Sequence, residues 1–248
     1  MGRPPSTSTR GPSRNRVGSL RIVSSMATRH LLVDLAAEFS ASSPSGDVSV
    51  VSMGGVEAAT RVAAGEPFDG VVLAGGAIER LIAQGHILAG SRVDIVKSPM
   101  AIAVRTGEAR PSIETEEAVR QAVLAAPRIG YSTGPSGDHL IALFDRWGIS
   151  AAVKQRLVQA RPGIPVASLV AGGEADVGFQ QLSELMNVEG VEVLGLLPEA
   201  IQGTTIFAGG VASVSTQAAR VRELFAFMAS PAVAALKRKH GMQPASDV

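Results

Sequence analysis

Residues 20–39 of the 248-residue chain, LRIVSSMATRHLLVDLAAEF, place two hydrophobic patterns side by side. From Leu20 to Ser24 the apolar residues form a short run containing Ile and Val, which is typical of a buried strand. From Ala27 onward they recur at helical spacing, at Leu31, Leu32, Leu35, Ala36 and Phe39. The stretch therefore predicts a strand over 20–24 that turns directly into a helix over 27–39.

The same alternation continues to the end of the chain. The further strands that we expect are 48–52, 70–74, 100–105, 128–132, 157–160, 176–179, 191–196 and 205–208. The further helices that we expect are 56–64, 78–84, 114–125, 138–147, 165–171, 182–187, 217–229 and 231–240. Strands that alternate with helices predict an α/β fold, here two lobes of mostly parallel sheet flanked by helices.

Composition excludes several kinds of chemistry. The chain has no cysteine, so disulfides, thiolate metal sites and cysteine nucleophiles are excluded. Its four histidines show no metal-ligand spacing, and neither GxGxxG nor GxxxxGK[ST] is present, so we expect no metal and no cofactor. The apolar runs at 70–77 and 122–126 are far shorter than the roughly 20 residues that cross a bilayer, so we expect no membrane insertion.

Charge is distributed unevenly along the chain. Residues 1–19 contain four arginines and no acid, which leaves a small excess of acidic residues in the remainder. Nucleic-acid binding is not expected, because it needs clustered Lys and Arg. The segment 1–19 is rich in Pro, Ser, Thr, Gly and Arg and is predicted to be a disordered basic tail. It contains no apolar leader, so we expect a cytoplasmic protein as the sequence stands, or a periplasmic one if the true start is upstream.

Three of the turns from strand to helix are rich in small and hydroxyl residues: 24–28, 52–55 and 132–137. Ligands of parallel sheets gather beyond the carboxyl ends of the strands, where free N–H groups at helix N-termini favour an anion. The same residue types are also ordinary helix caps and turn residues, and both interpretations stand. The side chains expected in one cleft are Ser25, Thr28, Ser132, Ser136 and Gln181.

Two further features bear on the chemistry of this cleft. The acids in residues 173–179, GEADVGF, are predicted to form a polar turn before a buried strand rather than an acid–base pair. Gln180 and Gln181 follow that strand, and because strand side chains alternate we expect only one of them to face the cleft. His139 lies in the first turn after Ser136, where it is a candidate for proton transfer or simply for packing. Aromatic residues make up only 4% of the chain, which favours a small polar or anionic ligand over a saccharide.

Five motifs in order resemble a known family. They are LAAEF at 35–39, AGEPFDGVV at 64–72, GEADVG at 173–178, FMASP at 227–231 and KHGMQPA at 239–245. Together they resemble the type II periplasmic-binding-protein fold, in its molybdate-binding-protein-like branch of bacterial solute-binding proteins. Aconitate isomerase is similar to this same family, so the resemblance implies either a binding protein or an isomerase.

The resemblance also implies a division of the chain. One lobe would comprise 20–99 and 206–248, and the other 100–205, with hinge strands near 100–105 and 204–208. A small anion would be enclosed between the lobes by hinge motion. An ABC permease would be the partner of an exported protein. The residues implied to bind the ligand are Ser25, Ala27, Thr28, Gly54, Gly55, Ser132, Ser136, Gly163 and Gln181.

The sequence departs from the molybdate binders at three places. Those proteins have serines where this chain has Ala27 and Gly55 or Val56, and a tyrosine where it has Gln181. The resemblance therefore implies a different small anion, such as a carboxylate. A cytoplasmic isomerase of an unsaturated organic acid is the alternative to a binding protein, and a metabolite sensor is a third possibility. For an isomerase, the candidate residues nearest to the cleft are His139, Arg29 and Arg61.

Overall fold

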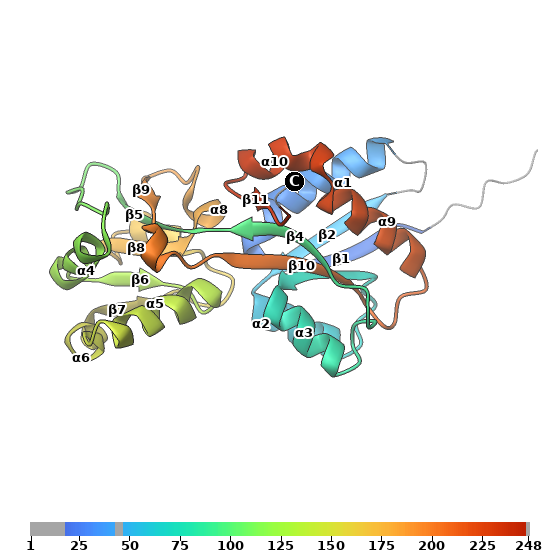
Figure 1. The fold of residues 1–248 in the computed structure, drawn as a ribbon, viewed down its shortest axis with the longest axis horizontal. Coiled ribbons are helices and arrows are strands. Elements are labelled where there is room, and N and C mark those ends of the chain that lie inside the picture. The colour runs from blue at the N-terminus through green and yellow to red at the C-terminus, as the bar shows by residue number, and fades with distance from the viewer. Residues whose placement is uncertain (1–17, 43–46, 247–248) are drawn as a thin grey trace, which may run out of the picture.

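The computed structural model describes residues 18–42 and 47–246, which form two sheets covered by helices (Figure 1). The predicted disordered tail, residues 1–19, lies outside the described residues except for its last two positions. None of the described helices has the length and apolar character needed to span a membrane.

The first sheet has the order β11-β4-β10-β3-β1-β2. Its strands are β1 (Leu20–Ser25), β2 (Val48–Met53), β3 (Gly70–Ala74), β4 (Val93–Ser98), β10 (Thr205–Val211) and β11 (Gln243–Pro244). Strands β1, β2 and β3 run parallel, whereas β10 runs antiparallel to both β3 and β4. The helices around this sheet are η1 (Met26–Thr28), α1 (Arg29–Ser42), α2 (Gly55–Ala63), α3 (Gly75–Ala83), α9 (Ala218–Ala229), η4 (Pro231–Val233) and α10 (Ala234–Lys239).

Alternation of side chains along the strands gives this sheet two cores. On one face, Leu20 and Ile22 of β1 pack with apolar residues of α1 and α9. On the other, Val23 of β1 and Val71 of β3 pack with α2 and α3. Both faces are therefore covered, as expected for parallel strands that are apolar throughout.

The second sheet has the order β7-β6-β8-β5-β9. Its strands are β5 (Met100–Arg105), β6 (Ile129–Tyr131), β7 (Leu157–Gln159), β8 (Val177–Gln181) and β9 (Val191–Leu196). The helices are α4 (Glu116–Ala125), α5 (Pro135–Arg146), α6 (Ser150–Val153), η2 (Lys154–Arg156), α7 (Val166–Ala171), α8 (Leu182–Leu185) and η3 (Glu199–Ile201). Helices α4, α5 and α6 cover one face, and α7 and α8 cover the other. Strands β6, β7 and β8 are parallel, and β5 is antiparallel to its two neighbours.

The chain crosses between the two lobes twice, once from β4 to β5 and once on the way into β10 (Figure 1). The side chain of Gln202 joins these crossings. Its Oε1 accepts from Met100 N at 2.7 Å, and its Nε2 donates to Met100 O at 3.1 Å. Ser98 is paired with Thr205 in the first sheet, so the two segments lie side by side where they leave it.

Most predicted elements are present, with informative differences. Only three strands in each sheet pair in parallel. The strands that connect the lobes are antiparallel to their neighbours, as β10 is to β3 and β5 is to β8. Strand β4 falls in a stretch that no periodicity singled out, since Asp94 and Lys97 interrupt its apolar residues. Helix α5 begins at Pro135 rather than 138, because proline suits the first turn of a helix, where its missing N–H has no acceptor to lose.

Candidate functional site

A pocket of about 570 Å³ lies between the lobes. It is formed where β1, β2, β6, β7 and β8 end, and it extends along α2 and α3. Carboxyl ends of strands from both sheets thus meet at one place, which is where open α/β sheets bind ligands. The apolar part of the lining includes Ala27, Val56, Ala59, Leu73, Ala74, Ala77, Ile164 and Phe207.

Ser25, at the end of β1, provides an unsatisfied hydroxyl group in this pocket. The residue is 8% exposed, and its Oγ has no hydrogen-bond partner in the described part of the chain. Thr28 lies behind it and donates to the Ser25 carbonyl at 3.3 Å, without lining the pocket itself. A buried hydroxyl without a partner lowers the stability of the folded protein. A ligand that accepts its hydrogen bond would remove this cost.

The N-terminus of α2 forms the next part of the first lobe's wall. Gly54 is the N-cap, with no side-chain cap, and Gly55 begins the helix. A Cβ built on Gly54 would lie 3.5 Å from the backbone N of Gly163, so the two glycines approach each other across the pocket. Nearby, Ser183 of the second lobe donates to the carbonyl of Ala27 at 3.0 Å. The two lobes are therefore in direct contact around the pocket.

In the second lobe, the turn after β6 supplies the N-terminus of α5. Ser132 lines the pocket, and its Oγ is 2.9 Å from that of Ser136, which lies buried behind it. Gly134 N donates to the same Ser132 oxygen at 3.2 Å. Position 137 requires glycine, because a Cβ there would lie 1.9 Å from the Ser132 carbonyl oxygen. The turn is thus held tightly against the start of the helix.

Both glutamines at the end of β8 line the pocket, although alternation predicted only one. The difference arises because β8 ends at Gln181 and the chain turns there into α8. Gln181 Nε2 donates to Thr205 Oγ1 of the crossing strand β10 at 3.2 Å. Gln180 Oε1 accepts from Val166 N at 2.7 Å, at the start of α7.

Glu184, on α8, is a pocket residue that the sequence did not single out. Burial raises the pKa of its carboxyl to about 7, although a hydrogen bond from the Gln180 side chain opposes the rise. Four other charged residues line the pocket with exposed side chains: Glu57, Arg80, Asp138 and Arg161. Neither arginine forms an ion pair within residues 18–42 and 47–246.

With this geometry in view, comparison with known proteins identifies the family. The model of the bacterial extracellular solute-binding proteins matches residues 20–243. This chain belongs to that family. It is 37% identical, over 187 residues, to an aconitate isomerase from Pseudomonas sp., a match that covers 74% of this chain and 70% of the relative.

Solved structures of the same fold include two oxyanion-binding proteins. The periplasmic molybdate-binding protein of Azotobacter vinelandii matches with a TM-score of 0.71 and 20% identity, covering 90% of this chain and 98% of that one. The sulfate-binding protein of Mycobacterium tuberculosis H37Rv matches with a TM-score of 0.75 and 17% identity, covering 92% and 87%. The predicted family and two-lobed α/β fold are thereby confirmed.

Within this solute-binding fold, the predicted ligand-binding residues line the pocket except Thr28 and Ser136, which lie behind it. The residues suggested for an isomerase lie elsewhere. His139 Nε2 is 2.9 Å from the carbonyl oxygen of Ile201, so its ring packs against the second crossing segment. Arg61 pairs with Glu66 through two contacts of 2.6 Å, and Arg29 is exposed outside the pocket lining. None of the three lines the pocket, whereas Glu184 does.

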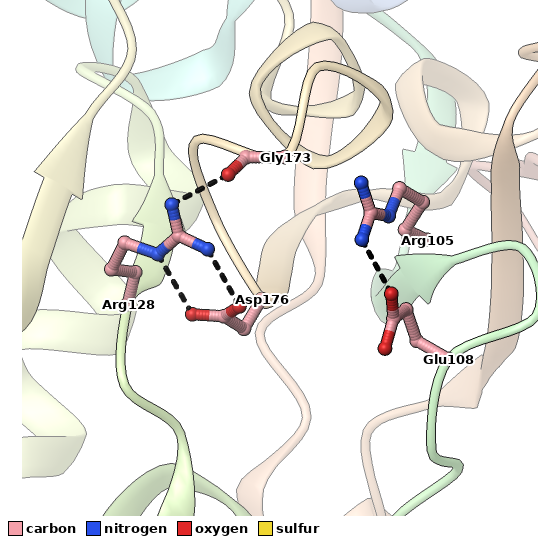
Figure 2. Close-up of polar contacts among 5 residues, drawn as sticks. All are labelled: Arg105, Glu108, Arg128, Gly173 and Asp176. Atoms are coloured by element: carbon pink, nitrogen blue, oxygen red, sulfur yellow. Dashed lines mark hydrogen bonds and ion pairs between the residues drawn. The ribbon is translucent and has the colours of Figure 1, made fainter.

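The acids before β8 form the polar turn that the sequence suggested. Arg128 donates to both carboxylate oxygens of Asp176, at 3.0 and 2.8 Å, and to the carbonyl of Gly173 at 2.6 Å (Figure 2). The hydrogen bonds from Arg128 lower the pKa of Asp176. Neither Asp176 nor Glu174 lines the pocket. Across the described ranges, no three His, Asp or Glu side chains are grouped as a metal ion would require.

Proposed function

We propose that this protein binds a small organic anion, a carboxylate, in the pocket between its lobes. The observation that carries the proposal is the Ser25 hydroxyl, which is buried in the pocket wall without a partner in the described residues. A carboxylate oxygen would accept its hydrogen bond, and bonds of this charge-assisted kind are the stronger ones.

Two helix ends support an anionic ligand. Helices α2 and α5, of 9 and 12 residues, both begin at the pocket, and the N-cap of each is a glycine, which has no side chain to cap the helix. The free N–H groups of their first turns and the positive ends of their dipoles favour negative charge. Arg80 and Arg161 add two cationic side chains to the lining.

The size and lining of the pocket support an organic ligand. Pockets for small organic molecules have roughly 300–1,000 Å³ and mostly apolar walls. The volume of about 570 Å³ and the alanine-rich lining agree with this class. The solved molybdate- and sulfate-binding relatives take tetrahedral oxyanions, whereas the aconitate isomerase relative acts on a carboxylate. The 37% identity to that relative favours the carboxylate.

We further propose how the ligand is enclosed. The lobes would comprise 20–99 with 206–248, and 100–205, and they would close by bending at the two crossings that Gln202 joins. For a member of the extracellular solute-binding family, the partner would be an ABC permease that receives the anion from the closed protein.

Calorimetric titration tests the proposal, with trans-aconitate, citrate and malonate as carboxylates and with molybdate and sulfate as oxyanions. We expect a carboxylate to bind best and Ser25→Ala to weaken it about 10-fold or more, the loss of one hydrogen bond to a charged group. Ser230→Ala is the matched control. Its hydroxyl is also buried and unpartnered in the described residues but lies between α9 and η4, outside the pocket and away from the crossings, so affinity should not change.

Failure of every carboxylate to bind would contradict the proposal, and so would equal weakening by the two serine variants. Isomerisation is the second candidate function, favoured by the aconitate isomerase relative and by a carboxyl group, Glu184, in the pocket. Isomerisation by proton transfer needs one group that removes a proton and returns it. Proton NMR of trans-aconitate after incubation separates the two functions, because only an isomerase changes the compound.

A further inference from the structure

Glu184 is held in the pocket wall by a fixed amide group. Because the Gln180 Oε1 accepts from Val166 N at 2.7 Å, the amide oxygen is turned toward the start of α7. The NH₂ end of the same amide is then the donor that reaches Glu184. The carboxyl therefore has one neutral hydrogen-bond partner and, among the described residues, no ion pair.

None of the elements packed against α8 brings a charge that shifts the pKa of Glu184. The turn after α10 lies against Leu182 of α8, but the charged residues that precede it, 237–240, do not contribute to that pKa. Helices η1 and α7 and strand β8 carry no ionisable side chain. Strands β5 and β9 contribute Arg105 and Glu192, which lie at the opposite end of β5 from Met100, the residue paired with Gln181. These two are engaged in ion pairs of their own, with Glu108 and Arg110.

The remaining charges are on the exposed parts of the pocket lining. Glu57 comes from α2, Arg80 from α3, Asp138 from α5 and Arg161 from the loop after β7. The rise in the pKa of Glu184 is caused by burial, with no contribution from any of these charges. The charges of the pocket lining therefore do not set the protonation state of Glu184.

We propose that Glu184 makes anion binding proton-coupled, so that each bound carboxylate is accompanied by one proton shared between Glu184 and a ligand oxygen. The inference rests on the proposed function and deepens it. A protonated Glu184 donates a hydrogen bond to the anion, whereas an ionised Glu184 repels it at short range. Binding must then favour the protonated form.

The proton shared between Glu184 and the ligand also makes the pocket selective among anions. The shared proton is held best by a ligand oxygen that is a good acceptor, as in the conjugate base of a weak acid. Carboxylates meet this condition better than sulfate, because hydrogensulfate, the conjugate acid of sulfate, is a stronger acid than a carboxylic acid. Glu184 would therefore be a specificity-determining residue that favours carboxylates.

The test is calorimetric titration in buffers of different ionisation enthalpy, which reports the protons taken up per ligand bound. The probe is the carboxylate from the panel above that binds best. Because burial raises the pKa of free Glu184 to about 7, uptake should be close to zero below pH 6, about one half at pH 7, and close to one above pH 8.

Glu184→Gln supplies the second measurement. An amide cannot titrate but keeps a donor, so binding should persist with proton uptake abolished and affinity nearly independent of pH between 6 and 8. Glu189→Gln is the control, because this glutamate is exposed and outside the pocket, and uptake should match that of the natural protein. If Glu184→Gln does not bind the probe, the pH dependence of proton uptake by the natural protein alone tests the proton coupling.

The outcomes separate the two proposals. Binding by the natural protein at pH 8 without proton uptake would overturn the proton coupling and leave the proposed function intact. Full uptake by Glu184→Gln would also overturn it, because another group would then be titrating. If no probe binds between pH 5 and 9, the proposed function fails, and the proton coupling fails with it.

Discussion

Strand β8 has a carboxyl group near each end, and the two differ in their partners. Asp176, directly before the strand, receives two hydrogen bonds from Arg128, which lower its pKa. Glu184, three residues after the strand, receives one from a neutral amide, and burial raises its pKa to about 7. Asp176 stabilises a turn through Arg128, whereas Glu184 lines the pocket. Partners, rather than the presence of an acid, distinguish a structural carboxyl from a reactive one.

Lys237 shows what the same rule predicts outside the pocket. This residue belongs to α10, and its side chain is fully buried. Its Nζ has no partner among residues 18–42 and 47–246, and burial lowers its pKa to about 8. Like Glu184 it is buried without a counter-charge, but it lines no part of the pocket. It therefore tests whether burial alone accounts for the shift.

We expect Lys237→Met to stabilise the protein at pH 7 by about 3 kcal/mol, because the methionine avoids burying a charge. Between about pH 8 and 10.5 the unfolded chain binds more protons at this position than the folded one, so the stability of the natural protein rises with pH. The difference in stability between Lys237→Met and the natural protein should therefore shrink over that range. Urea unfolding at pH 7 and pH 10 measures both effects. Lys239→Met, at an exposed position of the same helix, should change stability little at either pH. A destabilised Lys237→Met would mean that the amine has a stabilising role.

The sequence predicted most of the fold, because its hydrophobic spacing alternates between strand and helix with few interruptions. It missed β4, whose Asp94 breaks the apolar run and pairs instead with Arg92 at 2.8 Å. It placed the start of α5 late, although Pro135 marks it. In each case hydrophobic spacing alone did not mark the element, because charged residues interrupt β4 and the first turn of α5 precedes its periodic apolar residues.

Glu184 provides the second test of the comparison between the carboxyl groups at the two ends of β8. Between about pH 4.5 and 7 the folded protein binds more protons than the unfolded chain at this position, so its contribution to stability falls as pH rises. We expect Glu184→Gln to stabilise the ligand-free protein by about 2 kcal/mol at pH 8, less than the full shift implies because the side chain is partly exposed. The difference should disappear near pH 4.5. Urea unfolding at the two pH values measures it, and equal stability at pH 8 would contradict a buried, unpaired carboxyl.

The candidate site was harder to predict than the fold. Serines and glycines after the strands marked Ser25, Gly54 and Ser132, because turn chemistry is local. Glu184 gave no such signal, since its environment depends on Gln180, and the orientation of that amide is set by Val166 of another helix. For His139, whose place at the start of α5 allowed either proton transfer in the cleft or packing, the contact with Ile201 agrees with packing.

Asp176 gives the smallest expected effect at the other end of β8. Asp176→Asn removes the negative charge that faces Arg128 in Figure 2, and we expect a loss of about 1 kcal/mol at pH 7, since the pair is partly open to solvent. A carboxyl whose pKa is lowered in the fold stabilises at neutral pH and loses that contribution as pH falls below its usual range, so the variant and the natural protein should converge in acid. Glu108→Gln, which breaks the exposed pair with Arg105 beside it, is the control and should cost less. Ligand affinity should not change in either variant, because neither carboxyl lines the pocket, and weaker binding by Asp176→Asn would show that the turn also positions the site at the far end of β8.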